Sequence, residues 1–319
     1  MRIYRYCFGR GGFQPRLAIS VDGKTPVDLL DAWNDVTGTR LDEKGAPYLV
    51  STSALIEQGP EVWAEVRDVV RAAGSLADLL VREDEDNFKL LCPLDSVESL
   101  RDFLAFEDHV KAGAQRRGGE VPDYWYKAPV YYKGNHRALL GPGQECPWPP
   151  YTERLDFELE LAMIVGRRGR DIAKEKAGEY VFGFTVFNDF SARDVQASEI
   201  SAWLGPAKGK DFANAFGPCI VTADEVGSQP DLKMMCRVNG EEWGRARSSD
   251  AKWRWDDMIA HVSAGEDIYA GDVYGSGTPG GCCGLDLGRD LKPGDWVELE
   301  IESIGTLRNT IGSPSEPRR

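Results

Sequence analysis

Short segments in which apolar and polar residues alternate dominate the chain beyond residue 120. They are rich in β-branched and aromatic residues and are separated by Gly, Pro and Asp turns, a pattern typical of β-strands. We expect strands within residues 126–134, 155–166, 179–189, 216–226, 233–243 and 295–305. This part of the chain is therefore predicted to contain many strands and few helices.

The N-terminal part shows two other patterns. Apolar runs at residues 2–8 and 16–21 come before an Asp22-Gly23 turn, which predicts a small β-rich module. Pro60 begins a helical pattern that is expected to end near Gly74, with five apolar residues on one side: Val62, Trp63, Val66, Val69 and Val70.

A charged stretch at residues 82–87 is the predicted domain boundary. It divides the chain into a small N-terminal β-rich domain, residues 1–95, and a larger domain, residues 96–319. The predicted fold class is α+β and β-dominated.

The segment after this boundary has no clear strand period. Its apolar residues predict a helix or an irregular turn: Leu100, Phe103, Leu104 and Phe106. The following stretch, Lys111 to Gly119, is rich in Gly and Arg, and we expect an exposed loop that could serve as a lid.

One predicted strand carries acidic residues on a single face. Because strand side chains point alternately to opposite faces, Asp156, Glu158 and Glu160 lie together and apolar residues lie opposite them. A solvated face of an antiparallel strand would give the same pattern. An equivalent acidic set occurs near the C-terminus: Glu298, Glu300 and Glu302. Alternation alone does not decide which set forms a site.

A second segment favours the first set. An aromatic, apolar strand runs into Asn188-Asp189, and Ser191 with Asp194 then predicts a capping box at the start of a helix. Asp189 would lie at the end of a buried strand, where an ionised carboxylate needs a metal ion or a counter-charge. An aspartate that caps a turn would also fit.

Composition and charge narrow the possible functions. The chain has 52 acidic and 38 basic residues and a formal charge of −14, which argues against nucleic acid as a partner. A site for an anionic substrate must then supply local positive charge from a metal ion, Lys or Arg. No apolar stretch approaches the roughly 18 residues of a membrane helix, and the first residues lack a signal-peptide pattern, so we expect a cytoplasmic protein with no membrane partner.

The seven cysteines are scattered and form no C-x-x-C pair. This pattern predicts reduced structural thiols rather than a disulfide framework or a zinc site. The adjacent pair Cys282-Cys283 could be redox-active or nucleophilic, but no base can be placed beside it from the sequence.

Four motifs resemble the signature of the fumarylacetoacetate hydrolase superfamily. They are LDFELELAMIVGRRGRDI, FGFTVFNDFSARDVQ, GPAKGKDFANAFGPCIV and YGSGTPGG, and the resemblance covers about residues 96–312. It implies a mixed β-roll catalytic domain. It also implies a homodimer, since members of the superfamily commonly form one.

The resemblance implies a divalent-metal site. In the family, the metal is held by an E-x-E pair, by an aspartate in an N-D-x-S-A-R-D segment and by an aspartate upstream. The matching residues are Glu158, Glu160, Asp189 and Asp102. Carboxylate oxygens suit hard cations, so we expect Mg²⁺ first, with Ca²⁺ or Mn²⁺ as alternatives.

Catalytic and substrate-binding residues also follow from the resemblance. His109 matches a catalytic histidine, and two turns of helix would return it to the side of Asp102. Lys210 matches a lysine beside the metal. The expected substrate contacts are Arg193, Gln196, Tyr132, Gly277 and Thr278, while either Arg116 or Arg117 could correspond to a lid arginine. Lys133 stands where fumarylacetoacetases have a histidine. This difference bears on which substrate is bound and not on the fold.

The implied activity is metal-dependent hydrolysis of a carbon–carbon bond in a small β-diketo acid of the fumarylacetoacetate or acylpyruvate type. The alternative within the superfamily is a decarboxylase, dehydratase or isomerase of a 2-oxo acid such as oxaloacetate, acting through a metal-bound enolate. A non-catalytic or biosynthetic accessory protein on the same fold is the third possibility. In the first two, the partner is a small anionic 2-oxo or diketo acid.

Overall fold

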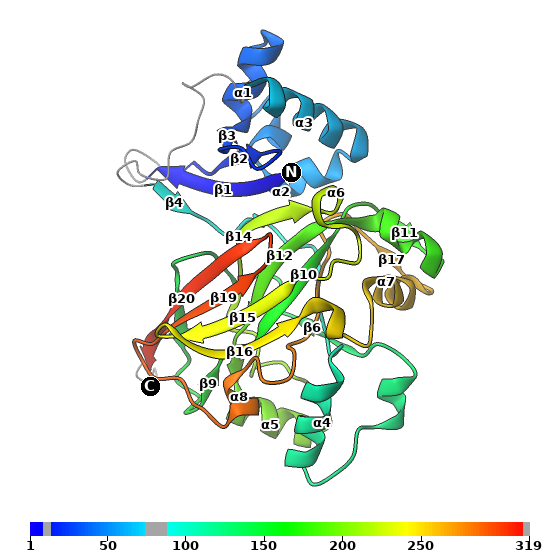
Figure 1. Ribbon diagram of the computed structural model, residues 1–319, viewed down its shortest axis with the longest axis vertical. Coiled ribbons are helices and arrows are strands. Elements are labelled where there is room, and N and C mark those ends of the chain that lie inside the picture. Colours follow the sequence, from blue (N-terminus) through cyan, green and yellow to red (C-terminus); the bar gives the residue numbers. More distant parts are fainter. Residues whose placement is uncertain (9–13, 74–87, 315–319) are drawn as a thin grey trace.

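A large mixed β-sheet organises the computed structural model, which describes residues 1–8, 14–73 and 88–314. Its strands run in the order β3 (Val27–Asp28), β2 (Arg16–Ser20), β1 (Arg2–Phe8), β14 (Asn214–Thr222), β12 (Val181–Asp189), β10 (Leu159–Val165), β18 (Val273–Gly275), β5 (Leu100–Phe103) and β6 (Tyr131–Gly134) (Figure 1). Two short strands extend it, because β4 (Phe88–Leu90) pairs with β1 and β7 (Leu139–Leu140) pairs with β14.

A second sheet packs against one face of the first. Its order is β16 (Glu241–Arg247), β15 (Lys233–Val238), β19 (Trp296–Ile301), β20 (Gly305–Pro314) and β8 (Glu145–Trp148). Two small ribbons complete the strands: β9 (Leu155–Asp156) with β13 (Ser191–Ala192), and β11 (Gly169–Arg170) with β17 (Asp267–Ile268). The α+β, strand-dominated fold predicted from the sequence is confirmed.

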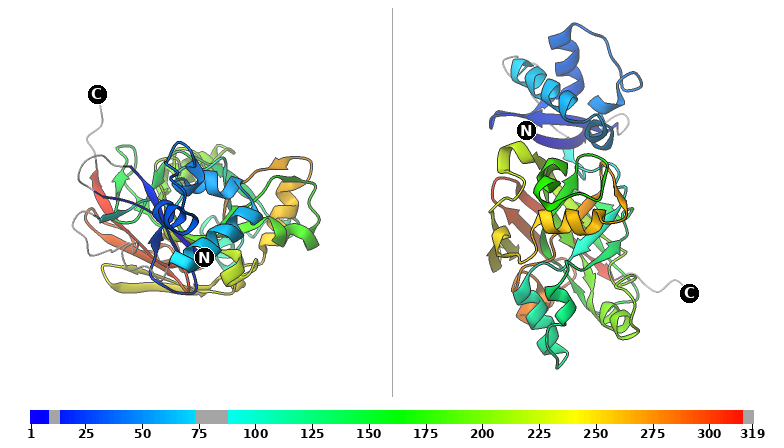
Figure 2. Two further views of the ribbon diagram at one scale, coloured as in Figure 1. Left: turned by 90° about the horizontal axis from the view of Figure 1, so that it is seen from above. Right: turned by 90° about the vertical axis from the view of Figure 1, so that its right-hand side faces the viewer.

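The helices lie around these sheets. They are α1 (Leu29–Thr37), α2 (Thr52–Glu57), α3 (Pro60–Ala73), α4 (Glu107–Arg116), α5 (Arg193–Ser201), α6 (Ala223–Val226), α7 (Trp255–Ser263) and α8 (Gly284–Leu287). Short 3-10 helices occur at Pro47–Leu49, Asp123–Tyr126, Lys174–Tyr180 and Ser248–Asp250. Figures 1 and 2 show the N-terminal elements at one end of the molecule and α4, α5 and α8 at the other. None of the helices described is long and apolar enough to cross a membrane.

Strand β10 separates two hydrophobic cores. Leu159, Leu161 and Met163 enter the core between the two sheets, whereas Ala162 and Ile164 enter the core beneath the N-terminal elements. Because successive strand residues face opposite sides, a strand covered on both faces is apolar in nearly every position. The acidic residues at its start are therefore exceptions within a buried strand.

The N-terminal region joins the large sheet directly. β1 pairs with β14, with Ile3 opposite Ile220, and the ring of Trp63 on α3 lies 4.7 Å from that of Phe182. The predicted strands and the helix that starts at Pro60 are present, but α1 and α2 were not foreseen. Gly74 and the charged stretch 82–87 lie outside the described residues, so the domain boundary stays a prediction.

Two local predictions were wrong. Leu100 to Phe103 form strand β5 rather than a helix or turn, because they lie between β18 and β6 and all four residues are buried. Lys111 to Arg116 belong to α4 rather than to a loop, since Val110 and Ala114, four residues apart, bury one helix face. The helix ends just before Gly118, which has a φ of +70°.

The predicted capping box is also absent. Ala192 occupies the position before α5 and provides no side-chain cap. The Ser191 hydroxyl donates to the Asp189 carbonyl, and Asp194 accepts from the backbone N–H of Glu153, 2.9 Å away. The helix start was predicted, but its capping contacts were not.

Candidate metal centre and active site

Four acidic side chains converge at one end of the large sheet. Asp102 lies in β5, Glu160 in β10 and Asp189 at the end of β12, while Glu158 precedes β10. All four are buried, and one ligand atom from each lies within 4.8 Å of those of the other three. The structure therefore brings together the four residues for which the family resemblance implies metal binding.

A glycine between two of these strands makes the convergence possible. β18 lies between β10 and β5, and its Gly275 is paired with Asp102 on one side and Ala162 on the other. A Cβ atom on Gly275 would lie 2.5 Å from Asp102 Oδ1 and 2.7 Å from Glu160 Oε2. Only the absence of a side chain lets the two carboxylates meet across the strand.

The carboxylates have unused ligand atoms. Among the described residues, Asp102 Oδ1, Glu160 Oε1 and Asp189 Oδ1 are buried and have no hydrogen-bond partner. Burial raises the pKa of Asp102 and Glu160 well above the usual carboxyl value, and nearby carboxylates raise it further. A divalent cation would remove both problems, because it accepts lone pairs and cancels negative charge. The all-oxygen set fits a hard divalent metal.

Lys210 supplies a positive charge within the cluster. Its Nζ donates to Glu158 Oε2 at 2.6 Å and also to Asp189 Oδ2. The Tyr132 hydroxyl donates to the same Asp189 oxygen at 2.8 Å. Burial opposes the charge on Lys210, but Asp189 and Glu158 hold its pKa above the usual value, so the ammonium remains protonated. Two donors thus orient Asp189 and leave its other oxygen free.

A second cation fixes Glu158 from the opposite oxygen. Arg193 Nη1 lies 2.8 Å from Glu158 Oε1, and its Nε donates to Asp156 Oδ2 at 2.8 Å. Burial alone would raise the pKa of Glu158, but Arg193 and Lys210 outweigh it and hold that pKa below its usual value. Gln196 accepts a hydrogen bond from Arg193 at 3.1 Å. Two of the residues predicted to contact substrate are thus linked to the metal cluster: Arg193 directly, and Gln196 through Arg193.

Asp156 has a separate task, although it shares the predicted acidic face. Its carboxylate accepts from Arg193 and from the backbone N–H groups of Gly284 and Leu285, at 2.8 and 2.9 Å. These N–H groups begin α8, and a carboxylate is favourable at a helix N-terminus. Asp156 thus connects Arg193 to α8 rather than contributing to the metal cluster.

His109 reaches the cluster from helix α4. Its Nδ1 lies 2.7 Å from Asp286 Oδ2, and its Nε2 lies 3.9 Å from Glu158 Oε1. The predicted geometry, with Asp102 and His109 on one helix, was wrong because Asp102 lies in a strand. The fold nevertheless places His109 beside a carboxylate of the cluster.

Asp286 is a functional candidate that the sequence analysis missed. Its Oδ2 accepts from the Gly281 N–H at 3.2 Å and bonds to His109, and its other oxygen forms an ion pair with Arg116, whose Nη1 lies 3.0 Å away. Burial opposes its charge, but the bond to His109 helps to keep its pKa below the usual value. In the sequence, Asp286 is a single acidic residue between two glycines, Gly284 and Gly288, and carries no signal of this role. Of the two arginines considered for the lid, Arg116 is the one that contacts this group.

Among the remaining predicted residues, Gly277 contacts the cluster directly. The Gly277 N–H donates to Glu160 Oε2 at 2.9 Å, and a Cβ there would lie 2.4 Å from the Phe103 carbonyl oxygen. Thr278 is buried and donates to the Cys282 carbonyl at 3.3 Å. Lys133 is exposed, because it points to the opposite side of β6 from Tyr132.

The alternative acidic strand forms no comparable cluster. Glu298 and Glu300 lie on the partly exposed face of β19, and Glu300 pairs with Arg237 at 2.8 Å. Glu302 is exposed and lies 3.4 Å from Lys233. These three residues therefore match the solvated-face interpretation.

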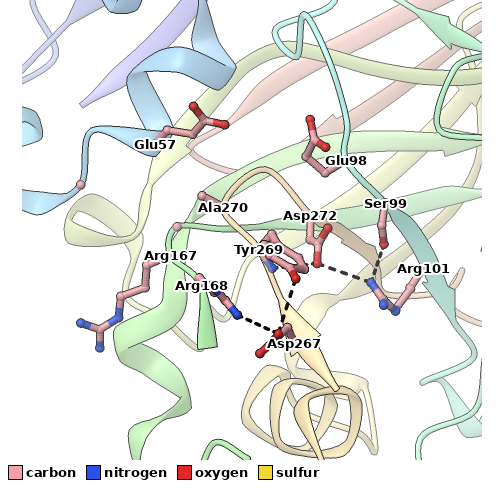
Figure 3. A pocket seen from close by; sticks show the side chains of 12 residues that line it. Glu57, Glu98, Ser99, Arg101, Arg167, Arg168, Asp267, Tyr269, Ala270 and Asp272 are labelled. Carbon is pink, nitrogen blue, oxygen red and sulfur yellow. Dashed lines mark hydrogen bonds and ion pairs between the residues drawn. The ribbon is translucent and has the colours of Figure 1, made fainter. Parts of the chain in front are cut away.

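A cavity of about 640 Å³ lies away from the acidic cluster. It is bordered by residues near α2, the start of β5 and the loop between β17 and β18 (Figure 3). Four of its charged groups pair with one another, Arg168 with Asp267 at 3.0 Å and Arg101 with Asp272 at 3.5 Å. None of the predicted site residues lines it, so the buried carboxylates give a better guide to chemistry than the volume of this cavity.

Comparisons with known proteins identify the family of the chain. A family model described as "Fumarylacetoacetate (FAA) hydrolase C-terminal" matches residues 99–312. The chain is 34% identical over 214 residues to oxaloacetate tautomerase Fahd2a, mitochondrial, from Rattus norvegicus, and the match covers 65% of this chain and 64% of the rat protein. It is also 34% identical over 209 residues to oxaloacetate tautomerase YisK from Bacillus subtilis, covering 65% of this chain and 67% of that protein.

A solved structure extends the similarity to nearly the whole chain. The fumarylacetoacetate hydrolase from the psychrophilic Exiguobacterium antarcticum has a TM-score of 0.72 and 26% identity, and the superposition covers 98% of this chain and 100% of that one. The family model alone covers more than half of the chain. The chain therefore belongs to the fumarylacetoacetate hydrolase family.

Proposed function

We propose that this protein is a divalent-metal-dependent enzyme that interconverts the enol and keto forms of a small 2-oxo acid of the oxaloacetate type. The observation that carries the proposal is the convergence of four buried carboxylates, three with unpartnered oxygens, beside Lys210 and a His109–Asp286 pair. The two relatives described above are both named oxaloacetate tautomerases, which supports this reaction ahead of hydrolysis.

The ion is proposed to be Mg²⁺, held by Asp102, Glu158, Glu160 and Asp189, with Mn²⁺ or Ca²⁺ as substitutes. When bound, it supplies positive charge beside the oxygen on which an enolate develops its negative charge. Lys210 adds a second positive charge at the same place. This local charge offsets the repulsion that a protein of net charge −14 exerts on an anionic substrate.

His109 is proposed to move the proton. Since Asp286 is a buried carboxylate 2.7 Å from Nδ1, that nitrogen donates to it and Nε2 is left able to accept a proton. Tautomerisation takes a proton from one atom of the substrate and returns one to another, so water is not consumed. Asp286 acts here as a positioning residue that holds the imidazole in this tautomer and orientation.

Carbon–carbon bond hydrolysis of a β-diketo acid is the second candidate. The same His109–Asp286 pair favours it, because an imidazole held by a carboxylate can also deprotonate water next to Glu158. Only hydrolysis puts a water oxygen into the new carboxylate. Turnover in ¹⁸O-labelled water, corrected for carbonyl exchange, therefore separates the two reactions.

The proposed activity is tested by adding the enol form of oxaloacetate to the Mg²⁺-loaded protein and following the loss of its ultraviolet absorbance. We expect His109→Ala to lower turnover by about 10² to 10⁴-fold, the usual contribution of a positioned general base. Metal binding should persist, and the matched control His261→Ala, an exposed histidine on α7, should retain activity.

Two results would contradict the proposal. If the metal-loaded protein does not accelerate enol loss, the tautomerase proposal is wrong. Cleavage of acylpyruvates with ¹⁸O incorporation would show that the protein is a hydrolase instead. Full activity of His109→Ala would exclude His109 as the proton carrier.

A further inference from the structure

A second group of potential metal ligands adjoins the carboxylate cluster. One ligand atom each of His109, Cys283 and Asp286 lie within 4.8 Å of one another. His109 comes from α4, whereas Cys283 immediately precedes α8 and Asp286 lies within it. Two segments that are distant in sequence thus meet around a nitrogen, a sulfur and an oxygen.

The Cys283 thiol lies near the charge of Arg193, which is already paired with Glu158 and Asp156. The side chain is completely buried, and within the described part of the chain its thiol makes no hydrogen bond. Its backbone forms a β-bridge with Glu158, which fixes it beside the carboxylate cluster. The proposed proton transfer makes no use of this thiol. Cysteine sulfur and histidine nitrogen are the ligand types that Zn²⁺ and other thiophilic cations take in proteins.

We propose that His109, Cys283 and Asp286 form a separate site for Zn²⁺ or a similar thiophilic cation, adjacent to the hard-metal site. Zinc takes His nitrogen at about 2.0 Å and Cys sulfur at about 2.3 Å, so ligand atoms around it lie roughly 3 to 4 Å apart. Small movements of the three side chains would bring the present separations into this range. The four-carboxylate cluster has no sulfur or nitrogen ligand, so the two sites differ in the cation that they prefer.

Binding at this site would inactivate His109. The cation replaces the thiol proton of Cys283, which passes to solvent, and occupies the imidazole and the carboxylate that now bond to each other. The imidazole can then no longer exchange a proton. This inhibitory consequence rests on the proposed function, whereas the binding itself does not.

Cadmium is the appropriate probe, because a Cd²⁺–thiolate contact produces an ultraviolet charge-transfer band and a Cd²⁺–carboxylate contact does not. The full-length protein is first saturated with Mg²⁺ to fill the carboxylate cluster and is then titrated with Cd²⁺. We expect a thiolate band that saturates at one equivalent, together with release of a proton measured by calorimetry in buffers of different ionisation enthalpy. Zn²⁺ should compete with the band.

Variants identify the ligands. The band should be lost in Cys283→Ala and strongly weakened in His109→Gln. It should persist in Cys282→Ala, because the thiol of Cys282 is not one of the three proposed ligands. Thermal unfolding checks that each variant is folded, and the partly exposed position of His109 makes its variant the safer of the two. Absence of the band in wild type, or its persistence in folded Cys283→Ala or His109→Gln, would overturn the site. These readouts need no enzymatic activity, so failure of the proposed reaction would leave them interpretable.

Discussion

Gly275 limits what can occupy the space between two of the proposed metal ligands. We predict that Gly275→Ala weakens metal binding at least about 10-fold, the scale of changes that disturb ligand orientation. The added methyl group would lie 2.5 Å from Asp102 Oδ1, so one carboxylate must move. Calorimetric titration with Mn²⁺ measures the change.

The matched control for this variant is Gly119→Ala. Gly119 follows α4 and has no left-handed φ, and a methyl group added there would meet no other atom within 4 Å. The control variant should bind Mn²⁺ as wild type does. Unchanged affinity in Gly275→Ala would mean that Asp102 and Glu160 do not have to approach each other.

Asp189 tests the choice between the two acidic strands. We predict that Asp189→Ala reduces metal affinity by at least about 100-fold, because loss of a ligand should exceed the 10–100-fold effect of altering a residue that supports one. Glu300→Ala, in β19, should leave affinity unchanged, since Glu300 pairs with Arg237 at the surface. Equal losses in both variants would show that the ion binds elsewhere.

At the scale of elements, α4 carries both His109 and Arg116, which contact Asp286 from two sides. We predict that its last turn and the residues after it, up to Gly119, exchange amide hydrogens faster without ligand than with metal and oxo acid bound. The lid function predicted from the sequence would then belong to a helix end rather than to a loop. Equal protection in both states, measured by hydrogen exchange, would contradict it.

Arg116→Ala provides a sharper test of the same helix. The substitution removes the ion pair to Asp286 at 3.0 Å, so exchange in the last turn of α4 should rise even in the liganded protein. Arg117→Ala is the control, because the described contacts give Arg117 no ion pair. Identical exchange in the two variants would show that Arg116 does not hold the helix end.

Strand positions were predictable from the sequence, because alternation and turn residues report local geometry. β10, β12 and β19 lie within the predicted segments. The prediction for Leu100–Phe103 was wrong because burial on both faces removes the alternation that marks a strand. The prediction of a loop at Lys111–Arg116 was wrong because it relied on the glycine and arginine content of the segment. The apolar face of the helix consists of only two buried residues, Val110 and Ala114.

The site was predictable only where a motif carried it. The four acidic residues matched the family pattern one by one, and the structure brings them together. Asp286 and Gly275 were missed because their roles depend on partners distant in sequence, His109 for one and Asp102 with Glu160 for the other. No local pattern records such pairings. Pairing within the large sheet, rather than helix periodicity, also positions Asp102.

At the scale of the whole molecule, the N-terminal region completes a core rather than standing apart. Ile164, Phe182 and Ile220 of the large sheet share one hydrophobic core with Ile3 and Val66. We predict that residues 96–319 alone are not stably folded, because that apolar face would be exposed to water. The full chain should unfold in one thermal transition.

A substitution in this core provides the quantitative check. Ile3 is fully buried between β2 and β14, so Ile3→Ala should lower the free energy of unfolding by about 2–5 kcal/mol. Arg40→Ala, an exposed residue of the same region, should change it little. A soluble, cooperatively folding 96–319 fragment that binds metal would instead support two independent domains.

The position of β10 between two cores also bears on how this chain can change in evolution. Inserting or deleting a single residue between Leu159 and Val165 would exchange the faces of every side chain beyond that point. Large leucine and methionine side chains would then be directed to the space that now fits Ala162, and the two cores would lose their packing together. Length variation among related chains should therefore be excluded from this strand and concentrated in surface connections, such as the turn after α5.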